Sequence, residues 1–109
     1  MKSLSHKAYP LLSLIADYTK HDDNGNLTSY WVPQATAQWS PTLKRTVYVS
    51  GAGDAAAING FVRNGWVVPQ RVAKYACALT EDGLIALENY REKYVYIDGR
   101  MPDQEVEVI

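Results

Sequence analysis

The chain of 109 residues contains a single cysteine and no long apolar run. Because Cys77 has no second cysteine to pair with, an internal disulfide and a thiolate metal cluster are both excluded. No apolar stretch approaches the roughly 18 residues that a membrane-spanning helix needs, and residues 1–7 are not followed by a segment typical of a signal peptide. The sequence therefore predicts a cytoplasmic protein in which Cys77 is a buried structural thiol.

The sequence also lacks the residue patterns of common active sites. His6 and His21 are separated and have no matching ligand cluster, and helix capping accounts for the neighbouring acids Glu81 and Asp82. The segment 51–53 has the glycines of half a phosphate-binding loop, without the Lys-Ser/Thr that completes one. No order of Ser, His and Asp reads as a catalytic triad. We therefore expect no metal, no cofactor and no enzymatic activity.

What the chain does contain predicts a compact globular protein. Hydrophobic residues make up 47% and charged residues 21% of the chain, which is close to average globular usage. Three Trp and eight Tyr supply large apolar bodies for a core. At this length we expect one domain over residues 1–98. An acidic tail over residues 99–109 follows, and it either forms an extra strand or stays mobile.

Charge is divided unevenly along the chain. Residues 1–80 carry eight Lys or Arg against four Asp or Glu, whereas residues 81–109 carry three against eight, so that the net charge is −1. A net charge near zero does not by itself favour nucleic acid, yet a chain polarised in this way is able to present a basic face. The other interpretation is that the acidic end is simply solvated.

The first half of the chain predicts one helix and a less regular segment. Apolar spacing predicts a helix from about residues 7–10 to Thr19, followed by a polar turn over 20–26. Residues 29–32 suggest a short strand, and Pro33 suggests a short helix that ends at Trp39. The β-branched and aromatic segment 46–49 predicts a strand.

The second half has clearer signals. Residues 51–53 predict a turn, and the Asp that follows them suits the start of a helix over 54–64. Ile58 and Phe61 form its buried stripe, and Gly65 is a typical helix end. Two strands over 66–68 and 75–79 come next, and Thr80 is a good N-cap for a final helix. The apolar face of that helix is formed by Leu84, Leu87, Tyr90 or Arg91, and Tyr94.

Two phrases in this half resemble the winged-helix family, including regulators of the MarR type. Residues 61–67 (FVRNGWV) are similar to the end of the family's recognition helix, and residues 75–87 (YACALTEDGLIAL) are similar to its last wing strand and the helix that follows. The resemblance implies an α+β winged helix-turn-helix fold, with three to four helices and a small antiparallel sheet of two to three strands. It covers roughly 40 residues well and the first helix loosely.

The sequence departs from the family upstream of the recognition helix. The family places another helix only a few residues before it, whereas here 46–49 and 51–53 look extended. Either the second helix is displaced to residues 33–45, or the chain is a divergent variant.

The resemblance implies a set of DNA-binding residues. A recognition helix enters the major groove and the wing touches the backbone or the minor groove. Asn pairs with adenine and Arg with guanine through two hydrogen bonds each, and cations on the wing suit phosphates. The implied residues are Ala56, Asn59, Gly60, Arg63 and Asn64 on the helix, Arg71 and Lys74 on the wing, and Lys44 and Arg45 in the segment before the helix.

Two functions therefore remain open. The first is a regulator that binds double-stranded DNA as a homodimer, paired through its terminal helices over 11–18 and 84–94. The alternative is a small phage or mobile-element protein that uses the same fold to bind and inhibit a host protein without binding DNA. The near-zero net charge and the acidic end favour the alternative.

Overall fold

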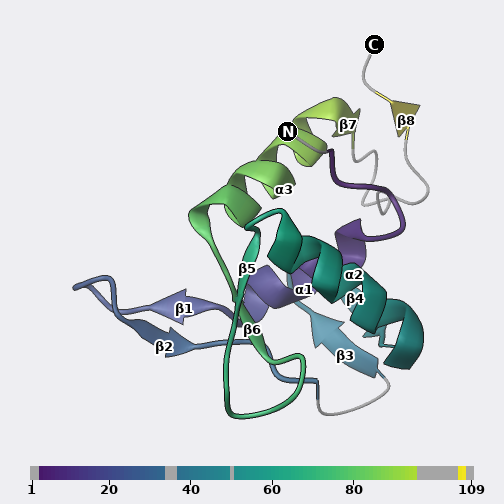
Figure 1. The fold of residues 1–109 in the computed structure, drawn as a ribbon. Helices are drawn as coiled ribbons and strands as arrows, with labels where there is room; N and C mark the ends of the chain where they lie inside the picture. The colour runs from purple at the N-terminus through teal and green to yellow at the C-terminus, as the bar shows by residue number, and fades with distance from the viewer. Residues whose placement is uncertain (1–2, 34–36, 50, 96–105, 108–109) are drawn as a thin grey trace.

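A computed structural model describes residues 3–33, 37–49, 51–95 and 106–107. Within these residues the chain is mixed α+β, with three helices and four two-stranded antiparallel sheets (Figure 1). The helices are α1 (Tyr9–Tyr18), α2 (Gly51–Arg63) and α3 (Glu81–Lys93). The strands pair as β1 (Lys20–His21) with β2 (Leu27–Ser29), β3 (Ala37–Ser40) with β4 (Arg45–Tyr48), β5 (Val67–Pro69) with β6 (Cys77–Leu79), and β7 (Tyr94–Val95) with β8 (Val106–Glu107). None of the helices in the described ranges is long and apolar enough to span a membrane.

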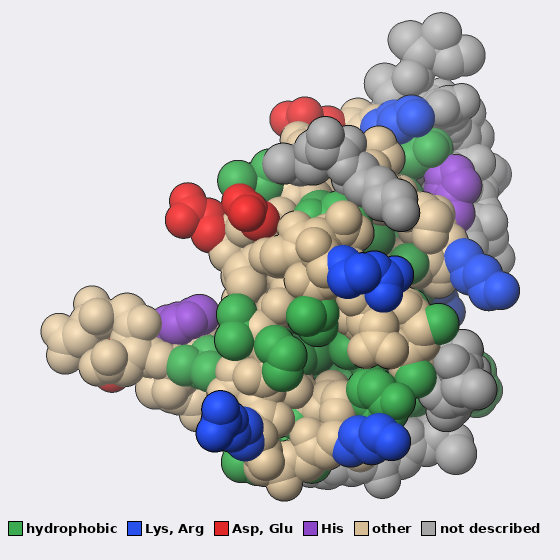
Figure 2. Space-filling view, in the orientation of Figure 1, with side chains coloured by type: hydrophobic (Ala, Val, Ile, Leu, Met, Phe, Trp, Pro, Cys, Tyr) green, Lys and Arg blue, Asp and Glu red, His purple; other side chains and the backbone are tan. Residues whose placement is uncertain are grey.

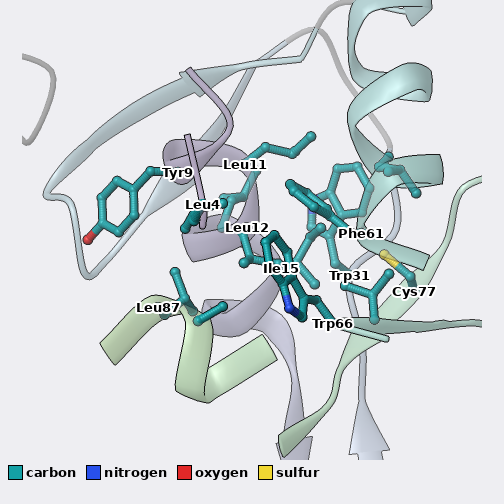
Figure 3. Close-up of a cluster of buried hydrophobic side chains, with 14 of the residues drawn as sticks. Leu4, Tyr9, Leu11, Leu12, Ile15, Trp31, Phe61, Trp66, Cys77 and Leu87 are labelled. Carbon is teal, nitrogen blue, oxygen red and sulfur yellow. The ribbon is translucent and has the colours of Figure 1, made fainter. Parts of the chain in front are cut away.

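The helix α1 lies at the centre of the core because it is buried on almost every side. It packs against β3, β4, β6 and α3, so its apolar residues meet partners from most of the chain. Figure 3 shows Phe61, Trp66 and Trp31 gathered around Ile15. Trp31 extends the small sheet as well, because its backbone exchanges two 3.0 Å hydrogen bonds with Cys77 on the free edge of β6.

The helices and most strands lie where the sequence places them, with three corrections. The strand expected over 29–32 is wrong, because β2 ends at Ser29 and Trp31 forms only an isolated bridge. The short helix expected from Pro33 to Trp39 is wrong where the structure describes its end, because residues 37–40 are the strand β3, while residues 34–36 lie outside the described residues. Its side chains alternate between the interior and the solvent, which is the period of a strand. The turn expected over 51–53 is also wrong, because these residues form the first turn of α2. Glycine costs least near a helix end, where few intrahelical hydrogen bonds depend on it.

A hairpin occupies the position at which a second helix was expected. Residues 37–48 form β3, a turn and β4, so the helix displaced to 33–45 is not found among the described residues. The hydroxyls of Ser40 and Thr42 donate to the two carboxylate oxygens of Asp17, and the Tyr18 hydroxyl donates to the carbonyl of Trp39 over 2.9 Å. The hairpin is thus fastened to the last turn of α1.

The polar turn expected over 20–26 is confined to residues 22–26, because Lys20 and His21 form β1. It is the tip of the β1–β2 hairpin, which projects from the body in Figure 1. Asp22 organises this tip by accepting hydrogen bonds from the backbone amides of Asn24 and Asn26, each at 2.9 Å. The amide of Asn26 contributes most to holding the pKa of Asp22 below its ordinary value. Gly25 provides the positive φ of 84° that closes the turn.

An aromatic cluster joins the segment before α1 to the end of α3. The rings of Tyr9 and Tyr90 are stacked with centroids 4.2 Å apart. His6 lies 4.4 Å from the ring of Tyr94 and is hydrogen-bonded through Nδ1 to the Tyr90 hydroxyl at 2.7 Å. Tyr90 and Leu87 lie in the core as expected, whereas Leu84 is exposed. Residues 99–105 and 108–109 of the expected acidic tail lie outside the described residues.

The junction between α2 and α3 is held by hydrogen bonds that involve Gly65, Thr80 and Gly83. Gly65, with φ of 74°, ends α2 and accepts a 2.6 Å hydrogen bond at its carbonyl from the Thr80 hydroxyl. The same hydroxyl caps α3 by accepting from the amide of Gly83 at 3.1 Å. The amide of Thr80 donates to the carbonyl of Trp66 at 2.9 Å, which starts the β5–β6 pairing. The N-cap predicted at Thr80 is therefore confirmed.

Replacing Gly83 with alanine tests this junction. An alanine Cβ would lie 2.2 Å from the carbonyl oxygen of Trp66 and 2.7 Å from Leu79 Cδ1, so backbone has to move. We expect Gly83→Ala to lower the free energy of unfolding, measured with urea, by about 3 kcal/mol. Gly60→Ala is the matched control, because its Cβ meets only a side-chain atom at 3.7 Å. The control should change stability by no more than about 1 kcal/mol, in the stabilising direction; equal losses in both variants would contradict this account.

Candidate nucleic-acid interface

The helix α2 separates its side chains into a buried face and an exposed face. Ile58 and Phe61 lie in the core. Ala56, Asn59 and Arg63 are exposed, and their spacing of three and four residues places them on one side of the helix. The structure thus brings together the helix residues that the resemblance implies.

Gly60 makes room for the side chain of Arg63. The guanidinium Nη2 of Arg63 lies 3.7 Å from the position that a Cβ would occupy at Gly60, so the side chain turns back along the helix toward its N-terminus, as long helical side chains do. Asn64 is exposed directly after the helix, and its amide donates to the carbonyl of Gly60 at 3.0 Å. The face of α2 around Gly60 therefore has short side chains and one long cationic side chain, that of Arg63.

The β5–β6 loop presents the two expected wing cations. Arg71 and Lys74 are both exposed, and Val72 between them is 67% exposed. Hydrogen bonds from Gln70 and within the loop hold its shape, and Tyr75 adopts a positive φ of 67° at its end. The Lys74 ammonium lies 5.4 Å from the centre of the Tyr75 ring, which fixes the direction of that cation.

Lys44 and Arg45 belong to a different surface. Lys44 is exposed in the turn between β3 and β4, where its φ is 54°. Arg45 is half-buried and lines a cavity of about 390 Å³ together with His6, Lys7 and Asp54. These two cations therefore come from the β3–β4 hairpin rather than from α2 or the wing.

The charges are segregated in space as well as in sequence. In the view of Figure 2, Lys and Arg side chains lie over α2 and the β5–β6 loop, whereas Asp and Glu side chains gather over α3, whose last turn also carries basic residues. A polyanion that approached the first region would meet cations before it met carboxylates.

Two surface features of the described residues were not predicted from the sequence. One is a groove of about 670 Å³ between the β1–β2 hairpin, the β5–β6 sheet and the start of α3. Its apolar wall is formed by Ala16, Leu27, Val68, Ala78, Leu79 and Leu84, and its polar edge by Thr19, His21, Gln70, Thr80 and Glu81. The other is the pair of exposed rings of Trp39 and Tyr48 on the β3–β4 hairpin. The sequence carries little signal for these rings, because the inward residues of β3, Gln38 and Ser40, are polar and no hydrophobic alternation marks the strand.

Comparison with family models, with curated proteins and with solved structures gives no match. Among the described residues, no three His, Cys, Asp or Glu side chains are grouped in a way that could hold a metal ion.

The thiol of Cys77 lies in the core, and its burial raises the pKa to about 12. The thiolate is the reactive form, so the folded protein at pH 8 should hold almost none of it. We expect 5,5′-dithiobis(2-nitrobenzoate) to leave Cys77 unlabelled in the native protein and to label it fully in urea. Rapid stoichiometric labelling of the native protein would contradict the buried position.

Proposed function

We propose that the protein binds double-stranded DNA as a winged-helix regulator, with α2 in the major groove and the β5–β6 loop against the backbone. The observation that carries this proposal is the exposed pair Asn59 and Arg63 on the face of α2 opposite Ile58 and Phe61. The order of α2, Gly65, β5, β6 and α3 supports it, because that order matches the recognition helix, wing and last helix of the family.

The residues of this surface form three groups, and each group has a different role in the proposed complex. Asn59 and Arg63 are the residue types that read adenine and guanine edges through paired hydrogen bonds. Ala56 and Gly60 have little or no side chain, so the helix backbone is able to approach the bases closely. Arg71 and Lys74 neutralise phosphates without reading sequence.

The β3–β4 hairpin replaces the helix that precedes the recognition helix in the family. In the proposed complex Lys44 at its turn supplies a further phosphate contact, while the half-buried Arg45 remains beside Asp54 and Lys7. The chain is on this view a divergent winged helix, in which the first half of the helix-turn-helix is a hairpin fastened to α1.

A homodimer remains part of the proposal, with a narrower interface than the sequence suggested. The apolar residues of α1 from Leu11 to Ile15 are buried in the chain's own core, so α1 has little apolar surface left to share. On α3, Leu84 and Ile85 are exposed. We therefore propose that a dimer forms chiefly through α3.

Salt dependence tests the proposal as a whole. Cations that displace counterions from phosphates make log K fall linearly with log salt, by about 0.9 per phosphate contact on duplex DNA. We expect a slope of roughly −3 if Lys44, Arg71 and Lys74 each neutralise one phosphate. Fluorescence anisotropy with duplexes selected from a random library measures this slope. Absence of binding to any duplex at about 50 mM salt would reject DNA binding.

Two substitutions separate sequence reading from backbone binding. We expect Arg63→Ala to cost about 1–3 kcal/mol on the selected sequence and to relax the preference at one position, whereas Arg71→Ala should weaken all duplexes alike and reduce the salt slope by about 1. Lys20→Ala removes an exposed cation from β1 and serves as the control for net charge. If both variants bind like the unmodified protein, the assigned surface is wrong.

The second candidate is a protein-binding module, and one observation favours it. The groove of about 670 Å³ is bordered by the exposed apolar side chains of Leu27, Val68 and Leu84, and exposed apolar patches mark interaction sites in soluble proteins. Failure of every duplex in the salt titration, together with binding of a protein that Leu84→Ser weakens, would replace the first proposal with this one.

A further inference from the structure

The β3–β4 hairpin has two faces of different character. Its pairs are Ala37 with Tyr48, Gln38 with Val47, Trp39 with Thr46 and Ser40 with Arg45. The inner face is fully occupied: the Gln38 side chain accepts from Trp31 Nε1 at 2.6 Å and donates to the carbonyl of Val32 at 3.0 Å, and Ser40 donates to Asp17. The outer face therefore consists of the alternate residues, led by Trp39 and Tyr48.

These two rings are unusually open to solvent. Trp39 is 55% and Tyr48 79% exposed, whereas Trp31 and Trp66 are 1% and 3% exposed. The register makes Trp39 and Tyr48 diagonal neighbours, a relation that places Cβ atoms about 7–8 Å apart on one face of an antiparallel pair. A fixed two-stranded ribbon thus presents two large aromatic side chains to the solvent, side by side.

The charge around these rings is positive. Residues 37–49 include no Asp or Glu, and their exposed cation is Lys44 in the turn, whereas Arg45 pairs with Ser40 on the inner face. The carboxylate of Asp17 lies behind the hairpin, where it accepts from Ser40 and Thr42. The cavity beside Tyr48 is lined by His6, Lys7 and Arg45, with Asp54 as its one acidic residue. The outer face of the hairpin, with its exposed rings and positive charge, is therefore suited to bind an anionic partner.

We propose that the outer face of the β3–β4 hairpin binds single-stranded nucleic acid, with unpaired bases stacked on Trp39 and Tyr48 and a phosphate near Lys44. Aromatic side chains beside cations are the general means by which proteins hold single strands, because every base offers a flat face to stack on. Bases in a duplex already stack on one another, so the rings of this site are distinct from the α2 and β5–β6 loop surface proposed for duplex DNA, and Lys44 is the one residue assigned to both.

Tryptophan fluorescence provides a direct test with the full chain. All three Trp are described, and only Trp39 is exposed, so it dominates quenching from the solvent. The protein is titrated with an oligothymidylate of about 16 nucleotides at roughly 50 mM salt, where such binding is strong. Binding should change the fluorescence emission of Trp39 and protect it from quenching by acrylamide. Trp39→Ala and Tyr48→Ala should each weaken binding roughly tenfold, measured by anisotropy of a labelled oligonucleotide, which corresponds to the loss of one base stack.

Matched variants isolate the hairpin from the rest of the surface. Val72→Ala removes an equally exposed apolar side chain from the wing and should leave binding of the oligothymidylate unchanged. Trp39→Phe keeps a ring and should retain most of the affinity, and it replaces Trp39→Ala if the alanine variant does not fold by circular dichroism. Lys44→Ala should reduce the salt slope by about 0.7, the value for one phosphate of a single strand.

Several outcomes would overturn the assignment of this face. They are no binding of the oligothymidylate, unchanged affinity in both folded ring variants, or a protein that binds this face in place of the single strand. Arg63→Ala distinguishes the two sites: it should impair duplex binding and leave the single strand unaffected. If the protein binds the oligothymidylate but no duplex, the proposed function is rejected and the hairpin site stands. If it binds a duplex but not the oligothymidylate, the hairpin site is rejected and the proposed function stands.

Discussion

The close packing of Gly83 against the carbonyl of Trp66 is the constraint on which the second half of the fold depends. A side chain at position 83 would separate the start of α3 from the end of α2, and the two hydrogen bonds made by Thr80 across this junction would be lost with it. Because β5 begins and β6 ends at this junction, the same contact helps to set the position of the β5–β6 hairpin relative to Arg63. The arrangement of α2 beside this hairpin therefore depends on the absence of a Cβ atom at position 83.

The last turn of α1 plays a comparable role for the first half. Three consecutive residues hold two parts of the chain: Asp17 and Tyr18 bind the β3–β4 hairpin through Ser40 and the carbonyl of Trp39, and the Thr19 hydroxyl accepts from the amide of Leu79 in β6. The β3–β4 hairpin thus packs on α1 in place of the helix expected over 33–45. Short hairpins are stable here because each is anchored to a buried helix, which supplies the burial that two strands cannot provide for themselves.

The sequence predicted the parts of the fold that have a strong period or a defined end. All three helices were found from apolar spacing and from the capping residues Gly65 and Thr80. It failed over 37–40, because Pro33 is equally suited to opening a helix and to an extended segment, and because the inward residues of β3 are polar. Gln38 and Ser40 face the interior through hydrogen bonds rather than through apolar contact, so no hydrophobic alternation marked the strand. The groove was beyond prediction, since four separate segments form it. The exposure of the proposed α2 surface followed from the burial of Ile58 and Phe61 on its opposite side.

The ring contact between His6 and Tyr94 brings two segments nearly the whole chain apart to the same end of the molecule, away from the β5–β6 loop in Figure 1. A short Gly/Ser linker between these two segments would therefore close the chain into a ring with little loop strain. New ends opened at the exposed tip of the β1–β2 hairpin would then give a circular permutant that keeps every contact of the core. In such a permutant, the end of α3 and the region before α1 would form one continuous segment of the chain.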